Sequence, residues 1–360
     1  MRAPCVLALS AVTVLGCDAA GTSRAAPSAV ASTAAPAVRA AERPAGFLKG
    51  QLHAHTGNSA DSETDPAEAA AWYAARGYDF VVFTDHNVVT EIAAPAGMLL
   101  MRGVELTQNL RTCEPAPEPG EACLLHVSAL FVRPERGPIR FSPDAPSRRQ
   151  DLYGRAVDRA IELGGVAQLD HPNFHHGADL DLVVAMARRG VSLLEVMNEA
   201  VDSNNEGDAR CPSTEALWDA ALARGARVFA TATDDAHHYG DAERVRARGG
   251  IAYTGDRGFV MVRAEKNEAA IRAAIVAGDF YGTTGVILER LSMSREAIEI
   301  DAREAGGPVT FEVIGDGRVV ETARGLALRH APAASGAAVV RVRVTDARGR
   351  RALTQPIFTR

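Results

Sequence analysis

Short apolar runs alternate with longer amphipathic segments through much of the chain. The runs that read as strands are 47–52, 80–84, 98–106, 124–132, 166–169, 193–197 and 228–232. The segments with a helical pattern are 66–76, 148–163, 180–189 and 214–224. Because strands that alternate with helices build β/α units, this order predicts a β/α barrel, which residues 259–263 and a helix at 267–278 close.

The pattern changes after residue 286. The stretches that follow either alternate apolar and polar residues or are rich in β-branched residues, and they are 287–301, 308–314, 318–329 and 338–346. Such stretches are typical of strands, and turns that contain glycine separate them. The sequence therefore predicts a barrel over 47–286 and a small all-β domain over 287–360.

The N-terminus reads as an export signal. The apolar stretch 6–16 is too short to span a bilayer, and residues 14–17 (VLGC) match a bacterial lipobox. We therefore expect a signal peptide at 1–16 and lipid on Cys17; the alternative is an ordinary secretory signal followed by a chance cysteine. Residues 17–46, mostly Ala, Ser, Thr and Pro, predict a disordered tether. The expected protein is exported and held in the bacterial cell envelope by its lipid alone.

Charge and cysteine usage narrow the class further. The formal net charge is −6, so there is no basic footprint for nucleic acid. Cys113 and Cys123 flank a Pro-rich loop, and an oxidising compartment favours a disulfide between them. Cys211 would then be a spare thiol, and no pair has the CxxC spacing of a structural zinc site.

Clusters of His, Asp and Glu stand where apolar runs end. They are His53-Ala54-His55 with Asp61, Asp85-His86, Glu105, His126, Asp170-His171 and Asp235-Ala236-His237, and they hold six of the ten histidines. Imidazole and carboxylate are ligands of divalent transition metals. Residues i and i+2 of a strand point to one face, so His53 and His55 project together, as do Asp235 and His237. One buried histidine is more often a core residue, but this many groups at strand ends predict a polynuclear metal site.

Six motifs resemble those of a known superfamily. In order they are LHAHT, FTDHN, GVEL, LHVSAL, LDHPN and TDDAH, and they resemble the motifs of the PHP superfamily, named for polymerase and histidinol phosphatase. Segments 271–285 and 340–358 resemble the CehA/McbA branch, the carbaryl-hydrolase-like metallohydrolases. The match covers roughly residues 47 to 358, and the order and number of the motifs make it specific. It implies an α/β fold, a distorted (β/α)7 barrel with a sandwich-like C-terminal domain.

The resemblance also implies a set of metal ligands. One ion would be held by His53, His55, Glu105 and Asp235, a second by Glu105, His126 and His171, and a third by Asp61, His86 and His237. Family members carry either His or Asp at the position of Asp61. Asp234 competes with Asp235, and the i,i+2 partnership with His237 favours Asp235. We expect two to three divalent ions, Zn, Mn or Fe.

The chemistry implied is ester hydrolysis. Two ions that share Glu105 would hold a bridging hydroxide as nucleophile, and a third would bind an oxygen of the substrate. We therefore expect a phosphoesterase, either phosphatase or phosphodiesterase, that acts on a small-molecule ester. The alternatives are a carbamate or carboxylic ester hydrolase, like the carbaryl-cleaving relatives, and a catalytically inert metal-binding module.

Residues beside the ligands are candidates for supporting roles. Asp85 and Asp170 each precede a ligand histidine, so each would orient an imidazole or serve as a polar group at a strand end. Asp85, His175 or His176 would protonate a leaving group. His175, His176 and His238 sit beside ligand motifs and would contact substrate, or would be ordinary loop histidines.

The segment 279–285 (DFYGTTG) offers two further polar groups. Tyr281 and Thr283 would donate hydrogen bonds to bound substrate. The alternative is that both belong to a structural turn.

Overall fold

The computed structural model describes residues 46–117, 119–142, 147–303 and 307–359. These residues all fall in one unit of the chain, Ala40–Arg360. The expected signal peptide at 1–16, the lipidation of Cys17 and the tether up to residue 45 lie outside the described residues and stay predictions.

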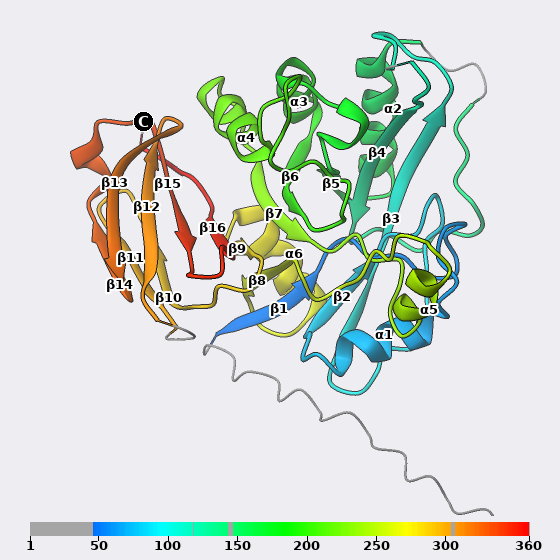
Figure 1. The fold of residues 1–360 in the computed structure, drawn as a ribbon, viewed down its shortest axis with the longest axis horizontal. Helices are drawn as coiled ribbons and strands as arrows, with labels where there is room; N and C mark the ends of the chain where they lie inside the picture. Colours follow the sequence, from blue (N-terminus) through cyan, green and yellow to red (C-terminus); the bar gives the residue numbers. More distant parts are fainter. Residues whose placement is uncertain (1–45, 118, 143–146, 304–306, 360) are drawn as a thin grey trace, which may run out of the picture. The chain divides into compact units, whose positions relative to one another are not determined.

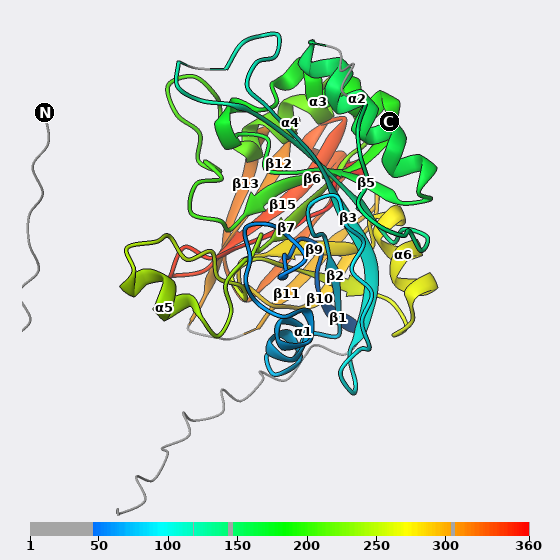
Figure 2. The same cartoon turned by 90° about the vertical axis from the view of Figure 1, so that its right-hand side faces the viewer.

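The described residues form two sheets (Figures 1 and 2). The strands of the larger sheet are β1 (Phe47–Gln51), β2 (Phe80–Phe83), β3 (Leu99–Leu110), β4 (Cys123–Leu130), β5 (Val166–Leu169), β6 (Val191–Asn198), β7 (Phe229–Thr233), β8 (Phe259–Arg263), β9 (Phe280–Thr283), β12 (Val309–Gly315), β13 (Arg318–Gly325), β15 (Val339–Thr345), β16 (Arg351–Thr354) and β17 (Ile357–Phe358). Those of the smaller sheet are β10 (Leu288–Met293), β11 (Ile298–Ala302) and β14 (Ala327–His330). The larger sheet runs β13-β12-β15-β16-β9-β8-β1-β2-β3-β4-β5-β6-β7, with β17 on β15, and the smaller runs β10-β11-β14.

Helices connect most strands of the first part of the chain. They are α1 (Pro66–Ala74), α2 (Arg149–Glu162), α3 (Leu180–Arg189), α4 (Thr214–Ala223), α5 (Ala242–Ala247) and α6 (Glu268–Ala277), with 3-10 turns η1 (Phe174–His176) and η2 (Pro332–Ser335). Side chains of Asp65, Asp179, Ser213 and Asn267 cap four N-termini by accepting backbone N–H bonds. The five expected helices are therefore present within two residues at each end, and the α/β class is confirmed.

One strand runs against the expected direction. β1, β2 and β3 are parallel, as are β5, β6 and β7. β4 is antiparallel to both β3 and β5. The uniform β/α alternation expected from the sequence is wrong here, because the connection from β3 to β4 holds no helix and the two strands form a hairpin from Gly103 opposite Leu130 to Leu110 opposite Cys123.

The two ends of the series β1 to β7 meet beyond the strands. The His55 N–H donates to the Ala236 carbonyl at 2.8 Å, and the Asp235 N–H donates to the His53 carbonyl at 3.1 Å. A parallel bridge pairs Ala54 with Ala236. The segments after β1 and β7, which carry four of the expected ligands, are therefore held side by side.

The C-terminal strands form two packed layers. Their inward residues share one core, with Leu291 and Ile300 from the smaller sheet and Phe311, Val313 and Val342 from the larger. Residues of β11 and of the first part of β12 alternate between buried and half-buried, as the sequence pattern predicts for sheets with one more solvated face. β16 pairs with β9, so the larger sheet continues from the N-terminal strands into this region.

A buried arginine joins this region to α4. Arg341 of β15 is 1% exposed, and its guanidinium donates to Asp219 at 2.7 Å and to Glu215 at 2.8 Å. It also lies over the ring of Trp218, 4.7 Å from the centroid. Because an unpaired buried charge is costly, these contacts fix how α4 packs on β15.

Among the described residues, no helix has the length and apolar character needed to cross a membrane.

Candidate metal centre

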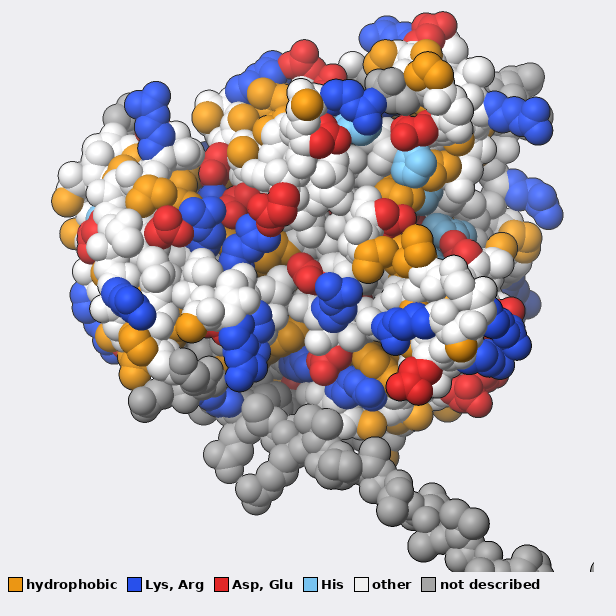
Figure 3. Space-filling view, viewed as in Figure 1, with side chains coloured by type: hydrophobic (Ala, Val, Ile, Leu, Met, Phe, Trp, Pro, Cys, Tyr) orange, Lys and Arg blue, Asp and Glu red, His pale blue; other side chains and the backbone are white. Residues whose placement is uncertain are grey.

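The expected ligands come from six strands or from the loops that follow them. His53 and His55 follow β1, His86 follows β2, Glu105 is in β3, His126 is in β4, His171 follows β5, and Asp235 and His237 follow β7. Asp61 belongs to the loop between β1 and α1. The structure brings all nine into one cluster, and Figure 3 shows histidine side chains in a hollow of the surface.

The first group consists of His53, His55, Glu105 and Asp235. The two Nε2 atoms of the histidines are 3.1 Å apart. Asp235 Oδ1 lies 3.3 Å from the first and 3.2 Å from the second. Glu105 Oε2 lies 3.5 and 3.3 Å from the same two nitrogens. Atoms that bind one ion at about 2.0–2.2 Å lie roughly 3–3.5 Å from one another, so this spacing fits a shared metal.

The second group uses the other oxygen of Glu105. Oε1 lies 2.7 Å from His126 Nδ1 and 3.4 Å from His171 Nε2. These two nitrogens are 3.2 Å apart. Glu105 therefore contacts two neighbouring ligand groups with its two oxygens, which is the arrangement of a carboxylate between two ions.

The third group lies nearer the surface. Asp61 Oδ2 is 3.0 Å from His86 Nε2 and 3.4 Å from His237 Nε2. The His237 ring stacks on that of His55, with centroids 4.1 Å apart. His86 Nδ1 also lies 2.9 Å from Glu105 Oε2, so this histidine stands between the third group and the first.

The chemistry of the donor set fits metal ions. Both oxygens of Glu105 are buried and no donor is aligned to hydrogen-bond them, although imidazole nitrogens surround them. The outer nitrogens of three rings face acceptors: His53 Nδ1 faces Glu195 at 2.7 Å, His126 Nε2 faces Asn109 Oδ1 at 2.9 Å, and His237 Nδ1 faces a backbone carbonyl at 3.0 Å. In a neutral ring this puts the proton on the outer nitrogen and leaves the inner lone pair free for an ion.

Protons compete for the same positions. Burial raises the pKa of Glu105, but His126, His86 and His53 outweigh it and hold the pKa well below its usual range. Burial lowers the pKa of His86 and His171, yet nearby carboxylates raise it to about 11 and about 9. Burial and His237 lower the pKa of His55 to about 4. The carboxylates thus attract positive charge strongly, either as protons or as metal ions.

Glu195 is a buried carboxylate that the sequence analysis missed. It lies in β6, is fully buried, and accepts hydrogen bonds from His53 Nδ1 at 2.7 Å and Thr233 Oγ1 at 2.7 Å. It also accepts from the His171 N–H at 2.8 Å and from Asn198 Nδ2 at 2.9 Å. It therefore orients the His53 ring and fixes the backbone at His171, and these two histidines belong to different ligand groups. The available signal was a lone acid inside the apolar run VSLLEVMN.

A pocket of about 270 Å³ opens onto the ligands. Besides the ligands it is lined by Phe174, Ala200, Asp202, Ser203, His238 and Tyr253. The Tyr253 hydroxyl donates to Asp202 Oδ2 at 2.8 Å, and its N–H donates to His238 Nδ1 at 3.1 Å. None of the described lining residues is Lys or Arg. His238, which the sequence left open as either a substrate contact or an ordinary loop histidine, thus lies beside the metal groups.

Asp85 and Asp170 do not orient the histidines that follow them. Asp85 is fully buried and accepts from the Thr56 N–H at 2.6 Å, the Thr56 hydroxyl at 2.8 Å and the Thr90 hydroxyl. It ties two loops together, so its expected catalytic role is wrong. Asp170 faces His53 Nδ1 at 3.9 Å, and its burial raises its pKa. Of the two expected roles, orienting an imidazole or serving as a polar group at a strand end, Asp85 has the second.

His175 and His176 lie outside the metal pocket. His175 Nδ1 is 3.6 Å from Glu121, and His176 Nε2 is 2.8 Å from Asp208. Neither side chain lines the pocket. The expectation that either serves as acid for the leaving group is therefore wrong, because both rings point to surface carboxylates instead.

Tyr281 and Thr283 are structural residues. Both are fully buried. The Tyr281 hydroxyl accepts from the Leu288 N–H at 2.9 Å, and its ring packs edge-on against Phe47. The Thr283 hydroxyl donates to the Val286 carbonyl at 2.8 Å. The expectation that they bind substrate is wrong, since they join β9 to the start of the C-terminal strands.

Asp234 and Asp235 face opposite ways. Asp235 meets the histidines of the first group, as expected. Asp234 accepts from Gln51 Nε2 at 2.6 Å, from the Tyr73 hydroxyl at 3.1 Å and from backbone N–H groups of residues 256–258. Burial raises the pKa of Asp234 to about 6 against these donors. Its role is to hold the loop before β8.

Cys113 and Cys123 form a disulfide across the connection from β3 to β4. Cys211 is a free thiol. This pairing is the one that the Pro-rich loop and export suggest.

Comparisons with known proteins add no assignment: no family model matches the chain, and no curated protein is significantly similar to it. The function is therefore argued from the site.

Proposed function

We propose that this chain is a metal-dependent hydrolase of the PHP superfamily, in its CehA/McbA branch, and that it acts as a phosphoesterase on a small-molecule substrate. Phosphatase and phosphodiesterase activities both fall within this proposal. The observation that carries it is Glu105, whose two buried oxygens face two groups of imidazole nitrogens from different strand ends. A buried carboxylate in such surroundings has little structural purpose without cations.

Each of the three ligand groups described above would hold one metal ion. Zn, Mn or Fe ions would be held by the three ligand groups, with Glu105 common to two of them. When bound, such ions supply an activated water and offset negative charge that develops on the ester. Glu195 holds His53 in the tautomer whose inner nitrogen is free, and Asn109 does the same for His126.

Residues of the pocket wall would contact the substrate. His238 Nδ1 accepts a backbone N–H, so a neutral His238 carries its proton on Nε2 and can donate it to a leaving group. The Tyr253 hydroxyl is held by Asp202, which fixes the ring as one wall. Phe174 forms an apolar wall and restricts water at the site.

A specific observation favours a second candidate, hydrolysis of a carbamate or carboxylic ester. No Lys or Arg is found among the described residues that line the pocket, and Phe174, Ala200 and Tyr253 form part of its wall. A neutral aryl ester needs no cationic side chain and gains from apolar contact. An inert metal-binding module is less well supported, because a pocket opens directly onto the ligands.

We also infer that β1 to β7 form the distorted seven-stranded barrel of this superfamily. The support is the pair of backbone hydrogen bonds that join the segments after β1 and β7. They close the series at the end where the ligands lie, which is the active end in β/α barrels.

Export and anchoring remain part of the proposal. Lipid on Cys17 would keep the enzyme in the cell envelope. Cys17→Ala should abolish palmitate labelling of the expressed protein and the effect of globomycin on its processing. Labelling that persists in the variant would reject the lipobox.

The test is a substrate panel with the purified protein loaded with Mn, Zn or Fe. It contains p-nitrophenyl phosphate, bis-p-nitrophenyl phosphate and aryl carbamates. Turnover of either phosphate above the carbamates supports the phosphoesterase. Turnover of carbamates alone supports the second candidate, and no turnover with full metal loading supports the inert module.

Glu105→Gln is the matching variant. It keeps the size and removes the charge, so metal content should fall and turnover should drop at least about 10²-fold. Glu296→Gln, on the exposed turn between β10 and β11, is the matched control and should change neither. A Glu105→Gln enzyme with full metal content and unchanged turnover would refute the proposed site.

A further inference from the structure

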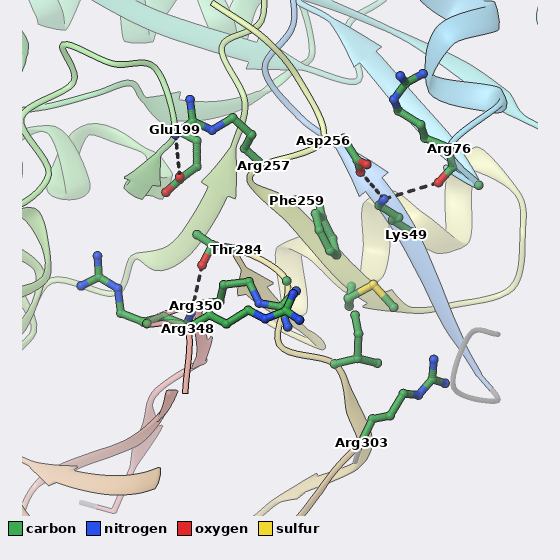
Figure 4. A pocket seen from close by; sticks show the side chains of 16 residues that line it. Lys49, Arg76, Glu199, Asp256, Arg257, Phe259, Thr284, Arg303, Arg348 and Arg350 are labelled. Atoms are coloured by element: carbon green, nitrogen blue, oxygen red, sulfur yellow. Dashed lines mark hydrogen bonds and ion pairs between the residues drawn. The ribbon is translucent and has the colours of Figure 1, made fainter. Parts of the chain in front are cut away.

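A second and larger cleft carries a concentration of positive charge. It has a volume of about 640 Å³ and is lined by Lys49 and by Arg76, Arg257, Arg303, Arg348, Arg350 and Arg351. We call it the basic cleft. Figure 4 shows these side chains arriving from several elements, with Arg348 and Arg350 extending towards Phe259 and Arg303 below them.

The charge of this cleft opposes that of the chain. Its lining has seven cationic residues and two acidic ones, Glu199 and Asp256, whereas the chain as a whole has a net charge of −6. Like charges this close repel one another, so their gathering lowers stability unless counter-charges are supplied. Neighbouring acids outside the lining neutralise only part of this positive charge, and a bound anion would neutralise the rest.

Some of the cations have partners that fix their position. Lys49 pairs with Asp256 at 2.5 Å and Arg350 with Asp346 at 2.7 Å. Arg303 pairs with Glu289 at 3.2 Å and Arg351 with Glu206 at 2.5 Å. Others are weakly held: Arg257 is 3.9 Å from Glu199. Within the described ranges Arg348 makes no ion pair, and its side chain is exposed. Arg257 and Arg348 are therefore free to bind a ligand.

The floor of the cleft is apolar. Phe259, Met261 and Ile287 line it, and Lys49 Nζ lies 4.4 Å above the centre of the Phe259 ring. Guanidinium groups pair bidentately with phosphate and carboxylate, while an apolar floor favours a hydrocarbon or aromatic body. The combination suits an amphipathic anion better than a simple inorganic ion.

This cleft is separate from the metal pocket, although two chain segments contribute residues to both. Glu199 faces the basic cleft, whereas its neighbour Ala200 lines the metal pocket. Likewise Arg257 lines the basic cleft and Tyr253 the metal pocket. The two pockets share no lining residue, so their ligands are recognised by different chemistry.

We propose that the basic cleft binds an organic anion with at least two phosphate or carboxylate groups on an apolar body. This site is independent of the hydrolase proposed above, because it contains none of the metal ligands. The anion is either a soluble metabolite or the headgroup region of an anionic lipid, and both present the same chemistry to the arginines.

The probe is pyrenetetrasulfonate, a fluorescent aromatic polyanion whose sulfonates bind metals weakly. Its anisotropy with the purified full chain should show saturable binding that weakens as salt is added. The double variant Arg257→Gln/Arg348→Gln should weaken binding at least about tenfold, because each removes charge-assisted hydrogen bonds. Arg257→Lys/Arg348→Lys keeps the charges but loses the bidentate pairing, so its affinity should lie between those of the unmutated protein and the Gln variant.

Arg318→Gln is the matched control, because Arg318 is exposed in β13 and does not line the cleft. It should leave the affinity unchanged. Displacement of the probe by 2,6-naphthalenedicarboxylate assigns a soluble ligand, and displacement only by vesicles that contain phosphatidylglycerol assigns a lipid. Equal loss in the Arg318 variant, unchanged affinity in the Arg257/Arg348 double variant, or displacement by neither competitor would overturn the proposal. Each outcome is independent of ester hydrolysis.

Discussion

Glu195→Gln tests whether the buried carboxylate behind His53 controls the metal centre. Glu195 Oε1 accepts from His53 Nδ1 at 2.7 Å and from Thr233 Oγ1 at 2.7 Å. Oε2 accepts from the His171 N–H at 2.8 Å and from Asn198 Nδ2 at 2.9 Å. A glutamine has the same size, but one end of its amide is NH₂, which cannot accept. Oε1 also accepts from Gln168 Nε2 at 3.2 Å, so at least two donors lose their acceptor whichever end carries the NH₂.

The magnitude follows from those two donors. Each buried donor left without a partner costs about 1–3 kcal/mol, so two such donors should lower the free energy of unfolding by about 2–6 kcal/mol. With the NH₂ at the Oε1 position, His53 also loses the acceptor that fixes its tautomer, and loss of such a partner lowers metal affinity by about 10–100-fold. Glu195→Asp keeps the charge but shortens the side chain, and we expect a smaller loss of affinity.

The assay is metal titration by calorimetry, together with urea unfolding of the metal-free and metal-loaded proteins. Glu296→Gln is again the matched control and should match the unmutated protein in both. A Glu195→Gln protein that is less stable yet binds metal with unchanged affinity would show a purely structural carboxylate. That result would refute the reasoning that Glu195 acts through His53.

Four further outcomes are expected. Arg341→Met leaves Glu215 without its buried partner and should lower the free energy of unfolding by about 3–5 kcal/mol, and an unchanged urea midpoint would contradict this packing. Burial raises the pKa of Glu215, but Arg341 and Arg343 outweigh it and lower the pKa below 4.5. The pair therefore stabilises the protein above about pH 4.5 and loses this effect as pH falls through the lowered pKa, so Glu215→Gln should be costly at pH 7 and progressively less costly in acid. Because the pKa of His171 is raised to about 9, the metal-free protein should lose stability as the pH rises from 6.5 to 9. Metal affinity should rise over the same range, because the ring must be neutral to bind an ion. An affinity that falls over this range would argue against His171 as a ligand. Mass mapping without reductant should join Cys113 to Cys123, and replacing both by Ser should cost about 3 kcal/mol, an expectation that free thiols at both positions would reject.

The order of strands and helices could be predicted from the chain alone. Apolar runs and capped amphipathic segments are local patterns, and backbone hydrogen bonding makes them strands and helices wherever they pack. The ligand set was likewise visible, because His53-Ala54-His55 and Asp235-Ala236-His237 combine metal-binding groups with a spacing that puts them on one face. The structure brings these groups together as the motifs suggested.

The direction of β4 and the roles of single polar residues were decided by tertiary packing. The connection from β3 to β4 is a Pro-rich loop without a helical pattern, which is compatible with a hairpin, but only the pairing of the two strands shows that β4 runs antiparallel. Asp85 and His176 have the residue types of catalytic groups, and only the positions of Thr90 and Asp208 reveal that both carboxylate and ring are already engaged. Adjacent sequence positions cannot show which way a side chain faces.

The remaining features arise from residues far apart in the chain. Glu195 reads as one acid in an apolar strand, and it becomes the partner of His53 only when β6 lies beside β1's continuation. The basic cleft unites Lys49 and Arg257 with arginines of the short segment 348–351, which are far apart in the sequence, although the total charge of the chain is negative. Local patterns fix which elements form, whereas charge and hydrogen-bond partners act through space and exist only once the sheet has brought those elements together.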